Sequence, residues 1–166
     1  KEYKNLNVMI PFVRTVDELK RTIKIMADEG LKRSGNFKIW MMTEVPSNIF
    51  LMEEFIKTGI DGISIGSNDL TQLILGVDRD SEKLRDTFDE RNPAVMKALE
   101  IAITTATRMG ITSSICGQAP SFYPDLTEKL VAWGITSVSV SPDMIGTTRE
   151  IVAKAEVKLK ANDNKA

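Results

Sequence analysis

DGISIGSNDLTQLILGVDRD, residues 61–80, is the stretch of this sequence that decides the fold. Ile63 and Ile65 alternate with small residues, which is typical of a short buried strand. Residues 66–69 follow directly and favour a turn with exposed backbone N–H groups. A strand that ends in a turn carrying an amide and a carboxylate is where α/β proteins usually place chemistry. The alternative is that Asn68 or Asp69 only caps the next helix.

Apolar runs on both sides of this stretch predict further strands, each followed by a segment with helical spacing. The predicted strands are residues 7–13, 38–45, 62–65, 112–115 and 136–140, and the predicted helices are 15–30, 48–57, 94–109, 125–133 and 144–160. Alternation of strand and helix with short connections indicates a parallel sheet with right-handed crossovers. We therefore expect one α/β domain over residues 1–160 and a disordered tail over 161–166.

Two α/β architectures accommodate this order of elements. One is an open, doubly wound sheet of about five strands, and the other is a partial (β/α)8 TIM barrel of about five βα units. Polar residues lie at or just past the ends of different strands: Arg14, Glu44, Asn68, Asp69 and Cys116. Convergence from many strand ends is typical of the barrel, whereas an open sheet gathers its functional groups at one switch point. The partial barrel is the predicted fold.

The charge balance and the residue counts limit the kinds of molecule and compartment that this chain is expected to encounter. The 166 residues carry 22 Lys and Arg against 23 Asp and Glu, so charge gives no case for binding nucleic acid or an anionic membrane. No apolar run reaches the roughly 18 residues that a membrane span needs, and no signal peptide opens the chain. The single cysteine, Cys116, cannot form an intrachain disulfide, and we expect a reduced, cytoplasmic protein. Histidine is absent, so any phosphohistidine must come from elsewhere.

Glu44 and Asp69 are candidate metal ligands at neighbouring strand ends. Two carboxylates on one rim suit Mg²⁺, which commonly takes one or two carboxylates and completes its shell with water and substrate oxygens. Zinc is disfavoured because the sequence has no histidine and no second cysteine. The alternative for Glu44 is an acid that interacts with the dipole of the helix that follows it.

Cys116 and Arg79 are the other candidates, and each has two interpretations. Cys116 lies at a strand end before Gly117, where exposed N–H groups and a nearby cation would favour the thiolate; otherwise it is a small buried hydrophobe. Arg79 pairs with Asp78 or Asp80 at the surface, or its planar guanidinium binds a phosphate or carboxylate of a substrate.

Six motifs occur in the order and approximate spacing of one enzyme family. They are MIPFVRT (9–15), TEVPSN (43–48), the opening stretch (61–80), FDERNPAV (88–95), ICGQAPS (115–121) and SVSVSPD (137–143). Over residues 7 to about 155 the chain resembles the C-terminal PEP/pyruvate-binding barrel of the phosphoenolpyruvate synthases, which are PEP-utilising enzymes. The related pyruvate, phosphate dikinases and PEP-protein phosphotransferases share SNDLTQ and the Cys-Gly pair, whereas FDERNPAV and ICGQAPS are typical of the synthases.

The resemblance implies roles for individual residues. Mg²⁺ would be held by Glu44 and Asp69, and Cys116 would donate and accept the proton at the methyl carbon of the substrate. The pyruvate/PEP site would be lined by Glu44, Gly66, Ser67, Asn68, Asp69 and Arg79. The full enzyme would convert ATP, pyruvate and water to AMP, PEP and phosphate through a phosphohistidine.

The resemblance also implies parts that lie outside this sequence. The family barrel has eight strands and this chain begins at the equivalent of the fourth, so two phosphate-binding arginines are expected elsewhere in the parent protein. The phosphohistidine and ATP-binding domains are expected there too, and we expect the isolated chain to be inactive. Because family barrels dimerise, a homodimer is expected. The alternatives are the barrel of a dikinase or of a PEP-protein phosphotransferase, or a non-catalytic dimerisation module.

Overall fold

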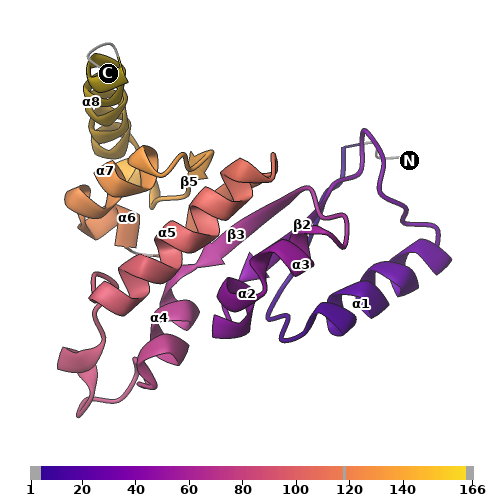
Figure 1. Cartoon of the computed structure of the whole chain (residues 1–166). Helices are drawn as coiled ribbons and strands as arrows, with labels where there is room; N and C mark the ends of the chain where they lie inside the picture. The colour runs from indigo at the N-terminus through magenta and orange to yellow at the C-terminus, as the bar shows by residue number, and fades with distance from the viewer. Residues whose placement is uncertain (1–4, 118, 164–166) are drawn as a thin grey trace.

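The computed structural model describes residues 5–117 and 119–163, and its centre is a five-stranded parallel sheet (Figure 1). The strands are β1 (Val8–Ile10), β2 (Ile39–Thr43), β3 (Gly62–Gly66), β4 (Thr112–Cys116) and β5 (Ser137–Val138). Each strand pairs in parallel with its neighbour in the chain, in the order β1-β2-β3-β4-β5. The predicted α/β class with five parallel strands is therefore confirmed.

Helices connect the strands. They are α1 (Val16–Asp28), α2 (Pro46–Phe50), α3 (Met52–Ile56), α4 (Ser67–Leu75), α5 (Pro93–Arg108), α6 (Ala119–Phe122), α7 (Pro124–Ala132) and α8 (Ile145–Asp163). Two 3₁₀ turns, η1 (Arg85–Thr87) and η2 (Pro142–Met144), lie in the loops. Side chains cap the two longest sheet-covering helices: Thr15 accepts the N–H of Glu18, and Asn92 accepts the N–H of Ala94.

The strand order has a consequence for the layers. Because the order never reverses, right-handed crossovers place the connecting helices on one face of the sheet, unlike in a doubly wound sheet. The helix-covered face is the core, and its residues Ile39, Met41, Ile63, Ile65 and Ile115 are 1% exposed or less. Leu99, Ala102 and Ile103 of α5 are buried against this face.

The opposite face of the sheet is more open. Met9 is 44% exposed, and Trp40 and Met42 are half-buried, although they alternate with fully buried neighbours along β2. Ser64 and Ser114 pair across β3 and β4 on this same open face. The sheet therefore has one packed face and one face of mixed character that no helix of the described ranges covers.

Several boundaries differ from the predictions. The first strand covers only Val8–Ile10 of the predicted residues 7–13, and the last covers only Ser137–Val138 of the predicted residues 136–140. The predicted helix 48–57 is divided at Leu51, whose φ of −117° and ψ of 29° end α2 and start α3. The predicted turn at residues 66–69 is instead the first turn of α4 from Ser67 onward. The last helix continues to Asp163, because neither glycine nor proline follows residue 160 to stop it. Residues 164–166, which are the rest of the predicted tail, lie outside the described residues, as does Gln118.

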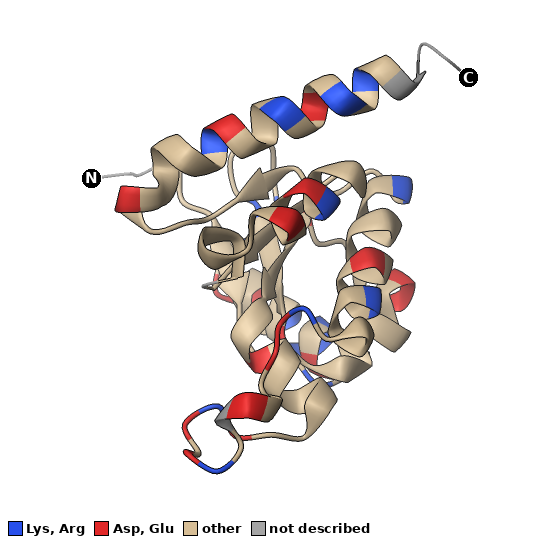
Figure 2. Ribbon diagram, turned by 90° about the vertical axis from the view of Figure 1, so that its left-hand side faces the viewer, with Lys and Arg blue, Asp and Glu red and all other residues tan. Residues whose placement is uncertain are grey.

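The surface carries charges of both signs. In the view of Figure 2, Lys and Arg alternate with Asp and Glu along α8 and are interspersed over the helices below it. The charged residues in that view do not separate into a positive and a negative region, which agrees with the near-neutral net charge of −1. None of the helices in the described ranges is both long and apolar enough to cross a bilayer.

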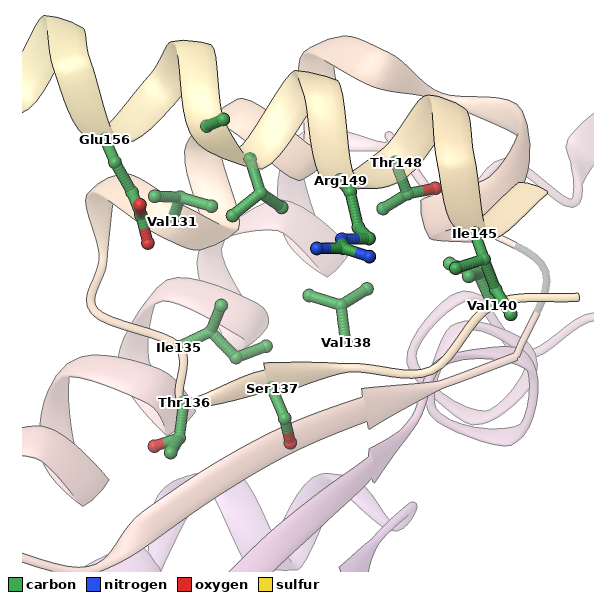
Figure 3. Close-up of a pocket in the computed structure, with 12 residues that line it drawn as sticks. Val131, Ile135, Thr136, Ser137, Val138, Val140, Ile145, Thr148, Arg149 and Glu156 are labelled. Atoms are coloured by element: carbon green, nitrogen blue, oxygen red, sulfur yellow. The ribbon is translucent and has the colours of Figure 1, made fainter. Parts of the chain in front are cut away.

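A cavity of about 440 Å³ lies between β5, α7 and α8 (Figure 3). Most of its lining is apolar and comes from Val131, Ile135, Val138, Val140, Ile145 and Val152. The guanidinium of Arg149 enters it from α8, and the buried Thr148 hydroxyl beside it has no hydrogen-bond partner among the described residues. The helix α8 therefore packs on α7 but leaves unfilled space over β5.

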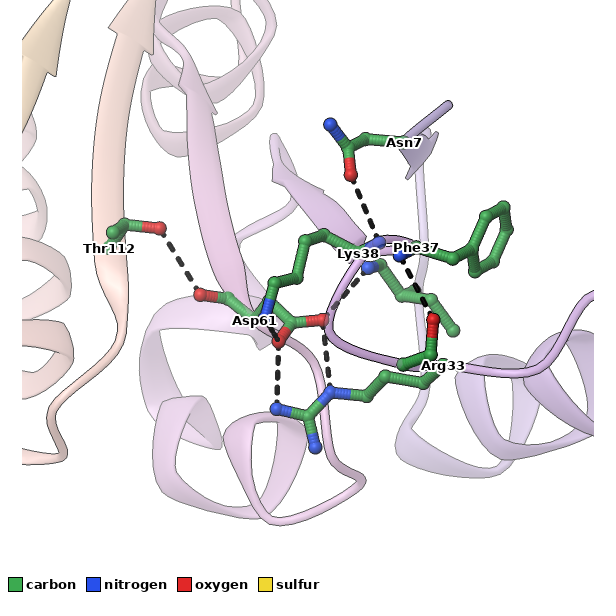
Figure 4. Close-up of polar contacts among 8 residues, drawn as sticks. Asn7, Arg33, Phe37, Lys38, Asp61 and Thr112 are labelled. Atoms are coloured by element: carbon green, nitrogen blue, oxygen red, sulfur yellow. Dashed lines mark hydrogen bonds and ion pairs between the residues drawn. The ribbon is translucent and has the colours of Figure 1, made fainter. Parts of the chain in front are cut away.

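Asp61, directly before β3, joins the amino ends of three strands (Figure 4). Its carboxylate accepts bonds from Arg33 Nε (2.9 Å) and Nη2 (2.8 Å), Lys38 Nζ (3.4 Å) and the N–H of Ile39 (2.9 Å). Its carbonyl oxygen accepts from Thr112 Oγ1 (3.1 Å). Burial alone would raise the pKa of Asp61, but the bonds from Arg33, Ile39 and Lys38 outweigh it and lower the pKa to about 2.

We expect Asp61→Asn to lower the free energy of unfolding at pH 7 by about 2 kcal/mol. An aspartate with a lowered folded-state pKa stabilises the fold above its unfolded pKa, near 3.8, and this contribution is lost as the pH falls to about 2. The variant should therefore lose less stability than the parental chain between those pH values. Urea denaturation across this range measures it. Asp28→Asn is the control, because that exposed pair with Lys24 contributes little; equal losses in both variants would contradict the prediction.

Candidate functional site

The candidate site lies where β2, β3 and β4 end at one edge of the sheet. In a parallel sheet, the carboxyl ends of neighbouring strands meet at the same edge. Glu44 directly follows β2, α4 begins with Ser67, Asn68 and Asp69 directly after β3, and Cys116 is the last residue of β4. The predicted site residues that follow these three strands are thus brought to one rim.

Glu44 is held in place from two sides. Its Oε2 accepts the backbone N–H of Phe12 at 2.9 Å, and Phe12 adopts a left-handed φ of 50° to present that group. Beneath the carboxylate lies Gly66, where an added Cβ would be 2.7 Å from Glu44 Oε1. The backbone of β3 can pass this close only because residue 66 has no side chain.

The charge of Asp69 influences the carboxylate of Glu44. Glu44 is only 8% exposed, and burial raises its pKa; the Phe12 N–H lowers it, and the negative charge of Asp69 raises it further. A cation between the two carboxylates would relieve both unfavourable contributions. The pairing of these two acids as metal ligands stays a prediction, and the effect of the Asp69 charge on the pKa of Glu44 is in line with it.

The donor set fits Mg²⁺ better than zinc. Within residues 5–117 and 119–163, no group of three or more His, Cys, Asp and Glu side chains gathers as an all-protein metal cage. Mg²⁺ commonly binds through one or two carboxylates and keeps water and substrate oxygens in its other positions. Glu44 and Asp69 are such a pair, and Oε1 of Glu44 accepts no hydrogen bond from the described residues.

Asn48 positions Glu44, a role that was not predicted from the sequence. The side chain is fully buried, and its Oδ1 accepts the N–H groups of Glu44 (3.1 Å) and Val45 (3.0 Å). Its Nδ2 donates to the carbonyl oxygen of Val13 at 2.8 Å. One side chain thus joins the end of β2 to the loop after β1. An asparagine two residues after the proline of a helix start was the available signal.

The turns after β3 and β4 are in direct contact. Ser67 Oγ lies 2.6 Å from Glu90 Oε1 and 3.1 Å from the carbonyl oxygen of Cys116. Gly117 has a φ of 113°, and a Cβ there would collide with the Ser67 hydroxyl. Two glycines, Gly66 and Gly117, therefore let the ends of β2, β3 and β4 approach one another.

Cys116 has polar neighbours. Its half-buried Sγ lies 3.5 Å from the carbonyl oxygen of Ile65 and 3.8 Å from Ser64 Oγ. Register places it opposite Gly66 and on the open face with Ser64, away from the helix-covered core. A cysteine that only fills a core would have apolar neighbours instead.

Arg79 lies beside Asn68 and Glu90. The Asn68 amide satisfies both neighbours when its nitrogen donates to Glu90 Oε1 (3.2 Å) and its oxygen accepts from Arg79 Nη1 (3.0 Å). Arg79 Nε is also 3.7 Å from Asp80 Oδ1, a longer ion pair at the surface. Around these groups is a cavity of about 410 Å³, which is lined by Asn68, Arg79, Asp80, Phe88 and Glu90.

Glu90 and Arg14 differ in their relation to the rim. The pKa of Glu90 is raised, mainly because the carboxyl is buried and also because of the negative charge of Asp89. The hydrogen bond from Ser67 and the positive charge of Arg79 oppose this shift but do not cancel it. Arg14 is directed elsewhere, because its Nη1 bonds Glu18 Oε1 at 2.9 Å and its guanidinium lies 5.7 Å from the Phe12 ring centre.

Comparison with known sequences identifies one family and relatives that share one name. The family model described as "PEP-utilising enzyme, PEP-binding domain" matches residues 1–157. The chain is 56% identical over 158 residues to the phosphoenolpyruvate synthase of Aeropyrum pernix, covering 94% of this chain and 19% of the relative. It is 49% identical to that of Helicobacter pylori, covering 94% and 19%, and 50% identical to that of Escherichia coli, covering 87% and 18%. The chain thus spans about a fifth of these relatives.

Comparison with solved structures adds a likeness of fold. RipC from Yersinia pestis, known from a crystal structure, superposes with a TM-score of 0.60 at 14% sequence identity. The match covers 88% of this chain and 63% of RipC. At this identity the likeness concerns the fold alone.

Proposed function

Because the chain belongs to the PEP-binding domain family of the PEP-utilising enzymes, we propose that it is the pyruvate/PEP-binding part of a phosphoenolpyruvate synthase. The observation that carries this proposal is identity of 56% and 49% to relatives of that name along 94% of the chain. The full enzyme would convert ATP, pyruvate and water to AMP, PEP and phosphate. The phosphohistidine and the ATP site would belong to other domains of the parent protein.

The rim supplies groups suited to each part of this chemistry. Glu44 and Asp69 would hold Mg²⁺, which when bound stabilises negative charge on the substrate oxygens. Cys116 Sγ would accept a proton from the methyl carbon of pyruvate, and the electron pair of that C–H bond would become the C=C bond of the enolate. The enolate oxygen would take the phosphoryl group from phosphohistidine. Asn68 and Arg79 would orient the anionic groups of the substrate.

Two other functions are to be distinguished from this one. The parent could be a dikinase or a PEP-protein phosphotransferase, and the nucleotide or protein acceptor that the full-length protein uses separates these enzymes. A non-catalytic dimerisation module is the third candidate. One observation supports a catalytic site over this third candidate. The polar residues expected of such a site are all present around one rim: Glu44, Asn68, Asp69 and Cys116.

We infer that the sheet is part of a (β/α)8 barrel. This is supported by the unreversed strand order, which right-handed crossovers combine with helices on one face of the sheet. The outer edges of β1 and β5 have no partner strand in the described ranges, and the apolar cavity beneath α8 adjoins the β5 edge. In the parent protein, further strands would cover both edges and this cavity.

On its own, the chain is expected to self-associate as a homodimer, because unpaired strand edges and exposed apolar surface favour pairing with a second copy. Sedimentation velocity over a wide concentration range measures this. Val138→Lys, at the β5 edge, should shift the equilibrium to monomer. The matched change Val157→Lys, at a site 68% exposed on α8, should not. A parental chain that stays monomeric at every concentration would refute the prediction.

Metal binding tests the proposed site directly. Titration calorimetry with Mg²⁺, or water-proton relaxation with Mn²⁺, should show weak binding that PEP strengthens, because PEP adds oxygen ligands. Glu44→Gln and Asp69→Asn should each weaken this binding several-fold, since each removes a charged ligand. Glu54→Gln, at an exposed position of α3, is the control. Binding that both substitutions leave unchanged would mean that the two acids serve only the helices that follow them.

A further inference from the structure

Glu90 is a buried carboxylate to which the proposed chemistry assigns no role. It is 6% exposed and lies in the loop between α4 and α5, two residues before the Asn92 cap. Burial of a carboxylate is unfavourable unless hydrogen-bond donors surround it. Here the donors are the two residues that open α4, Ser67 and Asn68. The loop after α4 thus returns to contact the start of that helix.

One oxygen of Glu90 receives both bonds. Oε1 lies 2.6 Å from Ser67 Oγ and 3.2 Å from the Asn68 amide nitrogen. An ionised carboxylate only accepts hydrogen bonds, so it requires the nitrogen of the Asn68 amide to face it. The amide oxygen must then face the opposite way, where it accepts from Arg79 Nη1 at 3.0 Å. With the amide reversed, an N–H group would point at the guanidinium, donor against donor.

We infer that Glu90 is a positioning residue of the candidate site: it fixes Ser67 and Asn68 and, through the Asn68 amide, holds the Arg79 guanidinium at the cavity that these residues share. The ligand that such a guanidinium recognises is a small molecule bearing a carboxylate or phosphate. This part of the inference rests on the proposed function.

The test uses nuclear magnetic resonance on the chain itself and two isosteric substitutions. Glu90→Gln keeps the size of the side chain but lets an N–H group face Ser67 and Asn68. Glu82→Gln makes the same chemical change at an exposed position of the same loop. The readouts are the side-chain N–H signals of Asn68 and Arg79 without ligand, and the affinity for PEP with Mg²⁺ present.

We expect Glu90→Gln to move the Asn68 and Arg79 signals, to leave the core amide signals in place, and to weaken PEP binding roughly tenfold. Glu82→Gln should change neither readout. Unchanged Asn68 and Arg79 signals in Glu90→Gln, or unchanged PEP affinity, would overturn the inference. A parental chain in which PEP moves no signal would instead contradict the proposed function and the ligand part of the inference, while the ligand-free signals would still decide whether Glu90 holds Asn68.

Discussion

Replacement of Cys116 by alanine in the full-length parent enzyme should slow exchange of the methyl protons of pyruvate with solvent by roughly a hundredfold or more, a loss typical of removing a general acid–base. Proton transfer at carbon needs a group of suitable basicity held over that carbon. Cys116 Sγ is half-buried at the end of β4, on the open face of the sheet beside Ser64. Formation of PEP should fall in parallel, since the enolate precedes it.

The experiment follows deuterium incorporation into pyruvate by nuclear magnetic resonance. ATP-dependent labelling of the enzyme is the internal control, because in the proposed reaction a histidine on another domain would be phosphorylated without Cys116. The labelling should be retained in the variant. Exchange at the parental rate would show that Cys116 is a packing residue and that a different group handles the proton.

Asn48→Ala should lower the free energy of unfolding of the chain by about 3 kcal/mol, because it leaves two buried backbone groups and one half-buried backbone group without a partner. These groups are the N–H of Glu44, the N–H of Val45 and the carbonyl oxygen of Val13. The same change should weaken Mg²⁺ binding, because the backbone that carries the Glu44 carboxylate is no longer fixed.

Denaturation by urea gives the stability, and Asn36→Ala is the matched control at an exposed position. That control should alter stability by no more than about 0.5 kcal/mol. A loss below about 1 kcal/mol in Asn48→Ala would mean that water or a local shift satisfies the three backbone groups.

Local pattern was sufficient to predict the elements of the sheet. The apolar runs around residues 38–45 and 112–115 and the alternation at 62–65 each correspond to an observed strand. The break at Leu51 could not be predicted, because no glycine or proline marks it and the backbone angles of a single leucine decide it. The start of α4 at Ser67 was hidden by residues that serve equally well in a turn.

The site was predicted in part, for a related reason. Glu44, Asp69 and Cys116 could be proposed because each lies at or just past the end of a predicted strand, and parallel strands end at a common edge. Asn48 and Glu90 were missed because their partners are distant in the sequence: Asn48 bonds Val13, 35 positions away, and Glu90 bonds Ser67, 23 positions away. Such pairs follow from tertiary packing, which a single sequence does not display.

The close approach of Gly66 to Glu44 links the mutational histories of the two positions. Any side chain at residue 66 would occupy the space of the Glu44 carboxylate, which lies 2.7 Å from where its Cβ would be. A change at residue 66 therefore forces the Glu44 side chain out of its present position, and it is easier to accept once residue 44 has become smaller. The effect of a substitution at one position thus depends on the residue at the other, so the order of substitutions matters.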